Sequence, residues 1–182
     1  MFIFTISCED TIKENNILDY GIVINEINYN SSNSFNPDDW VEIYNNGNDT
    51  IDISLWKLKD EDDEHFFTIP LNTIIIPNQY LIFCKDTIKF IELFPNVNYY
   101  YGDLGFGFSG GSDHIRLFDS TGSLVDDVEY DDDPPWPIAA DGDGSTLELK
   151  HPSLDNSNWE NWSPSQNHGT PGAINSAYNG DI

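Results

Sequence analysis

Short apolar runs, each closed by turn residues, constrain the fold of this chain more than any other feature. They are clearest at residues 23–27, 40–44, 56–59, 80–84, 114–118 and 146–149. Most alternate apolar and polar residues, which is typical of strands in a sheet with one buried face. Residues 86–94 are the one helical candidate, ended by Pro95. About nine short strands spaced at 8–12 residues predict an all-β sandwich or barrel with one short helix. Any functional site must then lie on loops or on a sheet face.

The chain is strongly acidic. Its 182 residues contain 32 Asp and Glu against 7 Lys and Arg, which gives a formal net charge of −25. Nucleic-acid binding depends on Lys and Arg at phosphates, and the basic residues here are scattered singly. We therefore expect no nucleic-acid partner and no direct binding to an anionic membrane. A divalent cation or a cationic partner is compatible with the charge, although solubility is its simpler explanation.

The first 20 residues resemble the end of a bacterial lipoprotein signal followed by a polar tether. An apolar start leads to Ser7 and then Cys8, the candidate for lipidation. The apolar run is shorter than the roughly 7–15 residues of a usual signal core, and no basic residue precedes it. Either the sequence begins inside a signal, which we favour, or the match is chance. We expect an extracellular or cell-surface location, with membrane contact through a lipid anchor alone, because no stretch is long enough to span a bilayer.

The two cysteines show no metal-binding or redox spacing. Cys84 ends an apolar run, so we expect it to be a buried free thiol that acts as a small apolar residue.

A series of short motifs follows in order between residues 22 and 175. They are Ile24-Asn-Glu-Ile27, Asp39-Trp-Val-Glu-Ile-Tyr-Asn45, Asn48-Asp-Thr-Ile-Asp-Ile-Ser-Leu-Trp-Lys-Leu58, Phe67-Thr-Ile-Pro70, Ser112-Asp-His-Ile-Arg-Leu-Phe-Asp119, Leu124-Val-Asp-Asp-Val-Glu-Tyr130, Trp136-Pro137, Asp141-Gly-Asp-Gly-Ser-Thr-Leu-Glu-Leu149 and Gly169-Thr-Pro-Gly172. In this order the chain resembles the bacterial branch of the lamin tail domain family, which has an immunoglobulin-like β-sandwich fold.

This resemblance implies a non-catalytic module. Such domains serve protein and chromatin contacts in animal lamins, and in bacteria they occur on secreted or surface-anchored proteins, often beside other domains. The basic patches of the animal branch have no counterpart here, so we do not expect a chromatin role. We expect residues 21–175 to form the domain and residues 176–182 to form a tail or linker. The domain would be an accessory, interaction or adhesion module of a larger multidomain chain, with a protein or glycan partner.

A carboxylate-pair hydrolase is one alternative. Glu26 and Glu42 lie among apolar neighbours in two predicted strands. If these strands were adjacent, the two acids would share a face and the pKa of one would rise, as glycoside hydrolases require. Lys57 or backbone donors could satisfy the two acids instead. The four histidines, His65, His114, His151 and His168, show no triad spacing, and no nucleophile elbow, phosphate loop or HExxH motif occurs. We therefore expect no catalytic activity.

A calcium-dependent binding module is the second alternative. Ca²⁺ takes six to eight oxygen ligands, and Asp141 and Asp143 alternate with glycines in one turn. Asp131, Asp132 and Asp133, together with residues 60–64, offer further carboxylates. The 141–145 segment is not an EF-hand loop, because Glu148 comes too early for the twelfth-position ligand. Ordinary solvated turns explain these acids more simply. No cofactor is required, and Ca²⁺ is the single candidate.

Loop tryptophans suggest a third kind of site. Trp136, Trp159 and Trp162 lie in segments rich in Pro, Asn and Ser, and exposed aromatic rings can stack on sugars or anchor a protein partner. The competing interpretation, which we favour slightly, is that this region covers a sheet edge and fills the end of the core.

Overall fold

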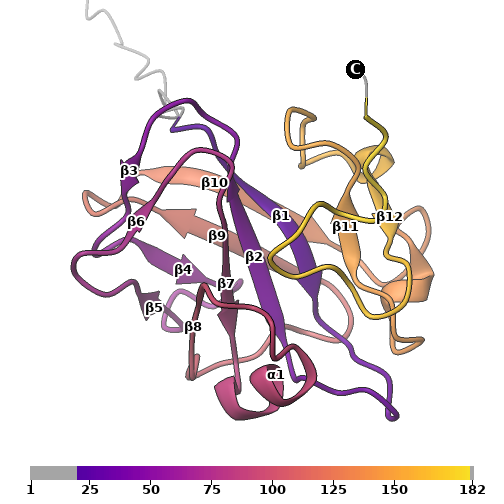
Figure 1. Cartoon of the computed structure of the whole chain (residues 1–182). Helices are drawn as coiled ribbons and strands as arrows, with labels where there is room; N and C mark the ends of the chain where they lie inside the picture. Colours follow the sequence, from indigo (N-terminus) through magenta and orange to yellow (C-terminus); the bar gives the residue numbers. More distant parts are fainter. Residues whose placement is uncertain (1–19, 181–182) are drawn as a thin grey trace, which may run out of the picture.

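The computed structural model describes residues 20–180, and Cys8 with the expected tether before the domain lies outside them. The described residues form a sandwich of two main sheets (Figure 1). The larger sheet has the order β12-β11-β1-β2-β7-β8 and the smaller has the order β10-β9-β4-β5. A two-stranded sheet joins β3 and β6. The prediction of an immunoglobulin-like all-β sandwich is confirmed.

The strands are short. The larger sheet contains β1 (Ile22–Asn28), β2 (Trp40–Asn45), β7 (Tyr80–Cys84), β8 (Tyr100–Gly102), β11 (Leu147–Leu149) and β12 (Trp162–Pro164). The smaller sheet contains β4 (Lys57–Lys59), β5 (Phe67–Thr68), β9 (Asp113–Phe118) and β10 (Leu124–Tyr130), and the pair is β3 (Ile51–Asp52) with β6 (Ile74–Ile75). The helices are α1 (Thr87–Leu93) and two 3₁₀ turns, η1 (Ile138–Ala140) and η2 (Trp159–Asn161). Brief two- and three-residue strands account for the excess over the expected nine.

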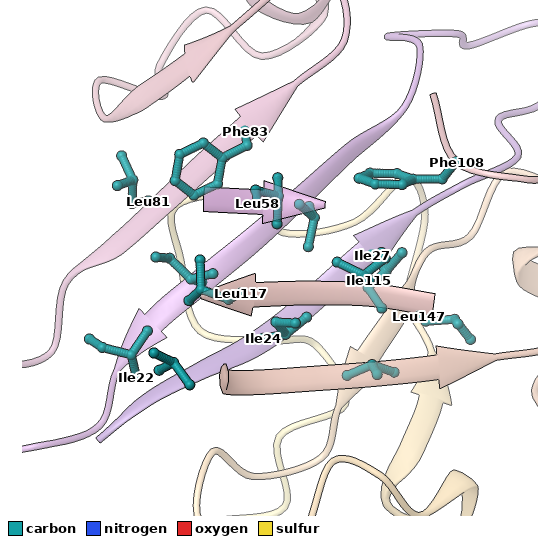
Figure 2. Close-up of a cluster of buried hydrophobic side chains, with 14 of the residues drawn as sticks. Ile22, Ile24, Ile27, Leu58, Leu81, Phe83, Phe108, Ile115, Leu117 and Leu147 are labelled. Carbon is teal, nitrogen blue, oxygen red and sulfur yellow. The ribbon is translucent and has the colours of Figure 1, made fainter. Parts of the chain in front are cut away.

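The main core lies between the two large sheets. Ile24 and Ile27 of β1 face Ile115 and Leu117 of β9, and Leu58 of β4 packs in the same layer (Figure 2). All five side chains are fully buried. Burial of apolar surface at about 25 cal/mol per Å² makes this layer the main source of stability.

A β-bulge in β1 decides which residues face this core. Ile24 pairs with Ile43 and Glu26 pairs with Glu42, so β1 has one residue, Asn25, more than β2 between these pairs. The extra residue lets Ile24 and Ile27 both reach the core although they are three positions apart. Glu26 consequently lies on the opposite, outer face of the larger sheet.

The outer face is covered as well. At one end, α1 begins at its N-cap Asp86 and packs Phe90 against Trp40, Ile82 and Cys84, a second buried cluster. Cys84 is a buried free thiol, as predicted. At the other end the C-terminal segment lies beside β11 and β12 (yellow in Figure 1). Burial on both faces explains why β2 and β7 are nearly continuous apolar runs. Among residues 20–180, no helix has the length and apolar character that crossing a bilayer demands.

Replacing Leu117 tests the core. Leu117→Ala should lower the free energy of unfolding by about 2–5 kcal/mol, because it leaves a cavity between the two sheets. Ile88, on the outer side of α1, is 67% exposed. Ile88→Ala should therefore change the free energy of unfolding by no more than about 0.5 kcal/mol. Chemical denaturation of the two variants measures the difference, and equal losses would contradict the assigned core.

Candidate functional site

Three buried glutamates lie side by side on the outer face of the larger sheet. Glu26 of β1 is paired with Glu42 of β2 on one side and with Glu148 of β11 on the other. All three residues are 0% exposed. The sequence suggested that Glu26 and Glu42 could share a face, and the register confirms it. Glu148 was missed as a third member, although it has the same setting of a glutamate between apolar neighbours.

The C-terminal segment binds these carboxylates through its backbone. We call residues 169–179 the strap. The backbone N–H of Thr170 donates to Glu26 Oε1 at 3.0 Å, and the N–H of Gly172 donates to Glu42 Oε2 at 2.6 Å. Thr146 Oγ1 donates to Glu26 Oε1 at 2.6 Å. Backbone N–H groups that would otherwise be unpaired on an irregular segment are thus satisfied by carboxylates of the sheet.

Glu148 holds the second half of the strap. Its Oε2 accepts from the backbone N–H of Ala177 and from Ser176 Oγ, both at 2.7 Å, and its Oε1 accepts from Thr170 Oγ1 at 2.8 Å. Tyr178 then stacks on His151, with ring centroids 5.1 Å apart. We expected a tail or linker from residue 176, but the packed part of the chain continues beyond that residue.

The strap starts with a glycine because nothing larger fits. Gly169 has a φ of +92°, a conformation that L side chains rarely adopt. A Cβ atom built there would also collide with Glu26 Oε1 and lie 2.9 Å from Thr146 Cγ2. The Gly169-Thr-Pro-Gly172 motif therefore lets the backbone approach the carboxylates closely.

Burial favours the protonated form of Glu26 and Glu42. Desolvation raises the pKa of Glu26 well above its usual value, and the negative charges of Glu42 and Glu148 raise it further. Desolvation also raises the pKa of Glu42 to about 8, against the opposing bonds from Gly172 N–H and the Asn25 amide. The Thr170 hydroxyl has one proton, which it gives to Glu148 at 2.8 Å. Its second and longer contact is with Glu26 Oε2, at 3.4 Å.

The glutamates are enclosed, and this closure bears on the hydrolase alternative. A general acid or base must lie within hydrogen-bond reach of its substrate. Glu26 and Glu42 are fully buried and bonded to the strap. The adjacent acids that the alternative needed are therefore present, but no substrate reaches them in this arrangement.

The four histidines do not converge on the glutamates or on one another. Within residues 20–180, no contact joins any two of them. Their neighbours are Asp60 for His65, Asp127 for His114, Tyr178 for His151 and Phe35 for His168.

A second cluster of acids surrounds a buried tyrosine. Tyr29 follows β1, is 2% exposed and stacks on Tyr130 at 4.4 Å. Its hydroxyl is buried and has no hydrogen-bond partner among the described residues. Burial raises the pKa of Tyr29, and the negative charges of Asp141, Asp132 and Asp131 raise it further. The sequence did not single out Tyr29, because it reads as an ordinary core residue.

The loops after β1 and η1 are joined next to Tyr29. Asn30 Nδ2 donates to Asp141 Oδ1 at 2.6 Å, and the N–H of Gly142 donates to Asn30 O at 3.0 Å. One carboxylate oxygen from each of residues 131–133 lies within 4.8 Å of the others. The structure thus groups Asp131, Asp132 and Asp133, and the charges of Asp131, Asp132 and Asp141 all act on Tyr29. No contact within residues 20–180 joins Asp143 to them.

The acidic 60–64 loop is organised differently. Arg116 donates from Nε to Asp60 O at 3.0 Å and from a guanidinium nitrogen to Asp63 Oδ1 at 3.0 Å. His65 Nδ1 lies 2.8 Å from Asp60 Oδ2. These acids already have basic partners, so this loop is a weaker cation candidate than the cluster around Tyr29.

The three loop tryptophans have different environments. Trp162 is 2% exposed, and its indole N–H donates to Asn156 O at 2.8 Å. Trp136 packs on Trp162, with ring centroids 6.1 Å apart. Trp162 is therefore a core residue that a ligand cannot reach, whereas Trp159 is 42% exposed.

The buried acids predict that stability falls as pH rises. Burial raises the pKa of Glu42 from 4.5 to about 8 and that of Asp126 from 3.8 to about 7. At a pH between a group's unfolded and folded pKa values, the folded state holds a proton that the unfolded state has lost. Unfolding then releases protons. The free energy of unfolding should then decline by up to about 1.4 kcal/mol per pH unit for each such group. Denaturant titrations from pH 4.5 to pH 8 measure this decline in the free energy of unfolding.

Glu26→Gln isolates one contribution to this slope. The amide cannot titrate, and it keeps an oxygen acceptor for Thr146 Oγ1 and for the Thr170 N–H. This variant should therefore have a flatter pH profile. Glu129→Gln, at an exposed position of β10, is the matched control and should keep the parental slope. An unchanged slope in Glu26→Gln would show that Glu26 does not titrate in this window.

Comparison with known families agrees with this architecture. A model of the lamin tail domain matches residues 20–132, more than half of the chain, and this region contains β1 to β10. The comparison with curated proteins gave no match. The strap, β11 and Glu148 lie beyond the matched residues but are joined to β1 by the bonds described above. On the extent of this match, the chain belongs to the lamin tail domain family.

Proposed function

We propose that this domain is a non-catalytic interaction module of a bacterial cell-surface or secreted protein, acting within a larger multidomain chain. One observation carries the proposal: the strap closes over the paired acids, so the fold uses them for its own hydrogen bonds. The family supports the same role, because the lamin tail domain is a non-catalytic immunoglobulin-like fold. The similarity of residues 1–8 to a lipoprotein signal supports a surface location with Cys8 as the lipid anchor.

Assays for hydrolysis test the non-catalytic role. The domain, incubated with neutral and acidic polysaccharides, should release no more reducing ends than buffer alone. Glu26→Gln should give the same result, because Glu26 bonds to the strap and not to a substrate. Release of reducing ends by the parent that Glu26→Gln abolishes, with the fold intact by circular dichroism, would refute the proposal.

Calcium binding is a second candidate function, favoured by the unpartnered hydroxyl of Tyr29. The negative charges of Asp131, Asp132 and Asp141 act on this buried group. Carboxylate and carbonyl oxygens are the ligands that Ca²⁺ prefers, and water often completes its shell. A bound ion would offset the mutual repulsion of these acids, and a water on that ion would give the Tyr29 hydroxyl a partner. The module would then bind its protein or glycan partner in a calcium-dependent way.

Thermal denaturation with Ca²⁺ or EDTA tests this candidate. Calcium at a hundred times its Kd would add about 2.7 kcal/mol, and each kcal/mol raises Tm by about 2–4 °C in a domain of this size. Asp132→Asn should remove most of this rise, whereas Asp49→Asn in an exposed turn should retain it. The same Tm in Ca²⁺ and in EDTA would eliminate the candidate.

A further inference from the structure

Two adjoining hollows form a trough on the outer face of the larger sheet. The larger, of about 490 Å³, lies between the start of β7, the loop before β8 and residues 171–173 of the strap. The other, of about 260 Å³, shares Asn78 and Tyr80 with it and continues to Tyr178. We call these two hollows together the trough. A third hollow of about 240 Å³ is lined by Leu81 and Tyr101, which pack against the main core, and so lies on the other side of the sheet edge.

The trough carries no formal charge on its walls. No Asp, Glu, Lys or Arg lines either of the two hollows, although the chain has a net charge of −25. The carboxyl groups of Glu26 and Glu42, which lie beneath the strap, are fully buried and bonded to it. An anionic ligand would be repelled by the molecule as a whole, and a cationic ligand would find no carboxylate in the trough. The walls therefore suit a neutral ligand.

Several polar groups of the trough have no partner in the protein. Within residues 20–180, the hydroxyls of Tyr80, Tyr99 and Tyr178 and the side-chain amide of Asn96 make no hydrogen bond. Tyr99 is 61% exposed and Tyr178 is 41% exposed. By contrast, the Tyr44 hydroxyl beside them donates to Asn78 Oδ1 at 3.0 Å. The trough thus offers exposed phenol rings together with free donors and acceptors.

We propose that the trough binds a neutral oligosaccharide. Sugar hydroxyls donate and accept hydrogen bonds, which matches side-chain amides and phenols, and the apolar faces of pyranose rings pack on aromatic rings. A trough of two adjoining hollows fits several sugar units better than one. This inference rests on the proposed function, because it names the partner class of the interaction module.

The strap links this binding surface to the buried glutamates. Pro171, Gly172 and Ala173 form one wall of the larger hollow. The hydrogen bond from Gly172 N–H to Glu42, at 2.6 Å, fixes that wall to the sheet. The enclosed acids therefore position the site and do not touch the ligand.

Isothermal titration calorimetry tests the proposal. The probes are the neutral hexasaccharides of β-1,4-glucan, β-1,3-glucan, β-1,4-mannan and chitin, with hexagalacturonate as the anionic comparison. At least one neutral probe should bind and hexagalacturonate should not. Tyr99→Ala and Tyr178→Ala should each weaken binding about tenfold. Trp159→Ala is the matched control, because Trp159 is 42% exposed and lies outside the trough, and it should leave binding unchanged.

The opposing outcomes are distinct. No heat from any neutral probe, or equal affinity in the parent and both tyrosine variants, would overturn the assignment. A protein partner that binds through Tyr99 while no oligosaccharide binds would also overturn it, but would leave the interaction module intact. Hydrolysis of a bound hexasaccharide that Glu26→Gln abolishes would instead overturn the non-catalytic role and support the trough.

Discussion

The fold depends on a solution to one electrostatic problem, which is the burial of three adjacent carboxyl groups. Isolated charges in a protein interior cost several kcal/mol each unless they are paired or neutralised. Here Glu26, Glu42 and Glu148 receive N–H donors from the strap, and burial favours a proton on Glu26. The strap in turn gains partners for its backbone. The sheet and the strap are thus interdependent, and the strap is part of the domain although it lies beyond the residues matched by the family model.

The surface has two candidate sites with different chemistry. The trough lies against the strap, is uncharged and is lined by tyrosines and amides. The cluster around Tyr29 lies next to the joined loops after β1 and η1 and is acidic. The two regions share no residue, so a neutral ligand in one and a cation in the other would not compete. The acidic residues of the chain lie outside the trough, so its net negative charge is compatible with both sites.

Local patterns in the sequence were sufficient to predict most of the strands, the short helix before Pro95 and the burial of Cys84. Each of these features depends mainly on residues that are neighbours in the sequence. The bulge at Asn25 was not predictable, because a single asparagine in a strand gives no clear signal of an extra residue. Without it, the register of Glu26 could not be assigned. The strap reaches Glu26 and Glu42 across more than 100 residues of sequence, as in the bond from Thr170 N–H to Glu26. The polar composition of the strap alone indicates only a loop.

The raised pKa values of Glu26 and Glu42 would often suggest an active site, since perturbed acids concentrate there. In this domain, burial is the largest cause of both shifts. The burial that raises the pKa also closes the route by which a substrate would arrive. The backbone donors that oppose the rise, Thr170 N–H and Gly172 N–H, belong to the strap. A catalytic acid needs both a shifted pKa and an open approach. Access therefore decides the interpretation. The acids with raised pKa values stabilise the strap, and the exposed rings of Tyr99 and Tyr178 are the groups that a ligand can contact.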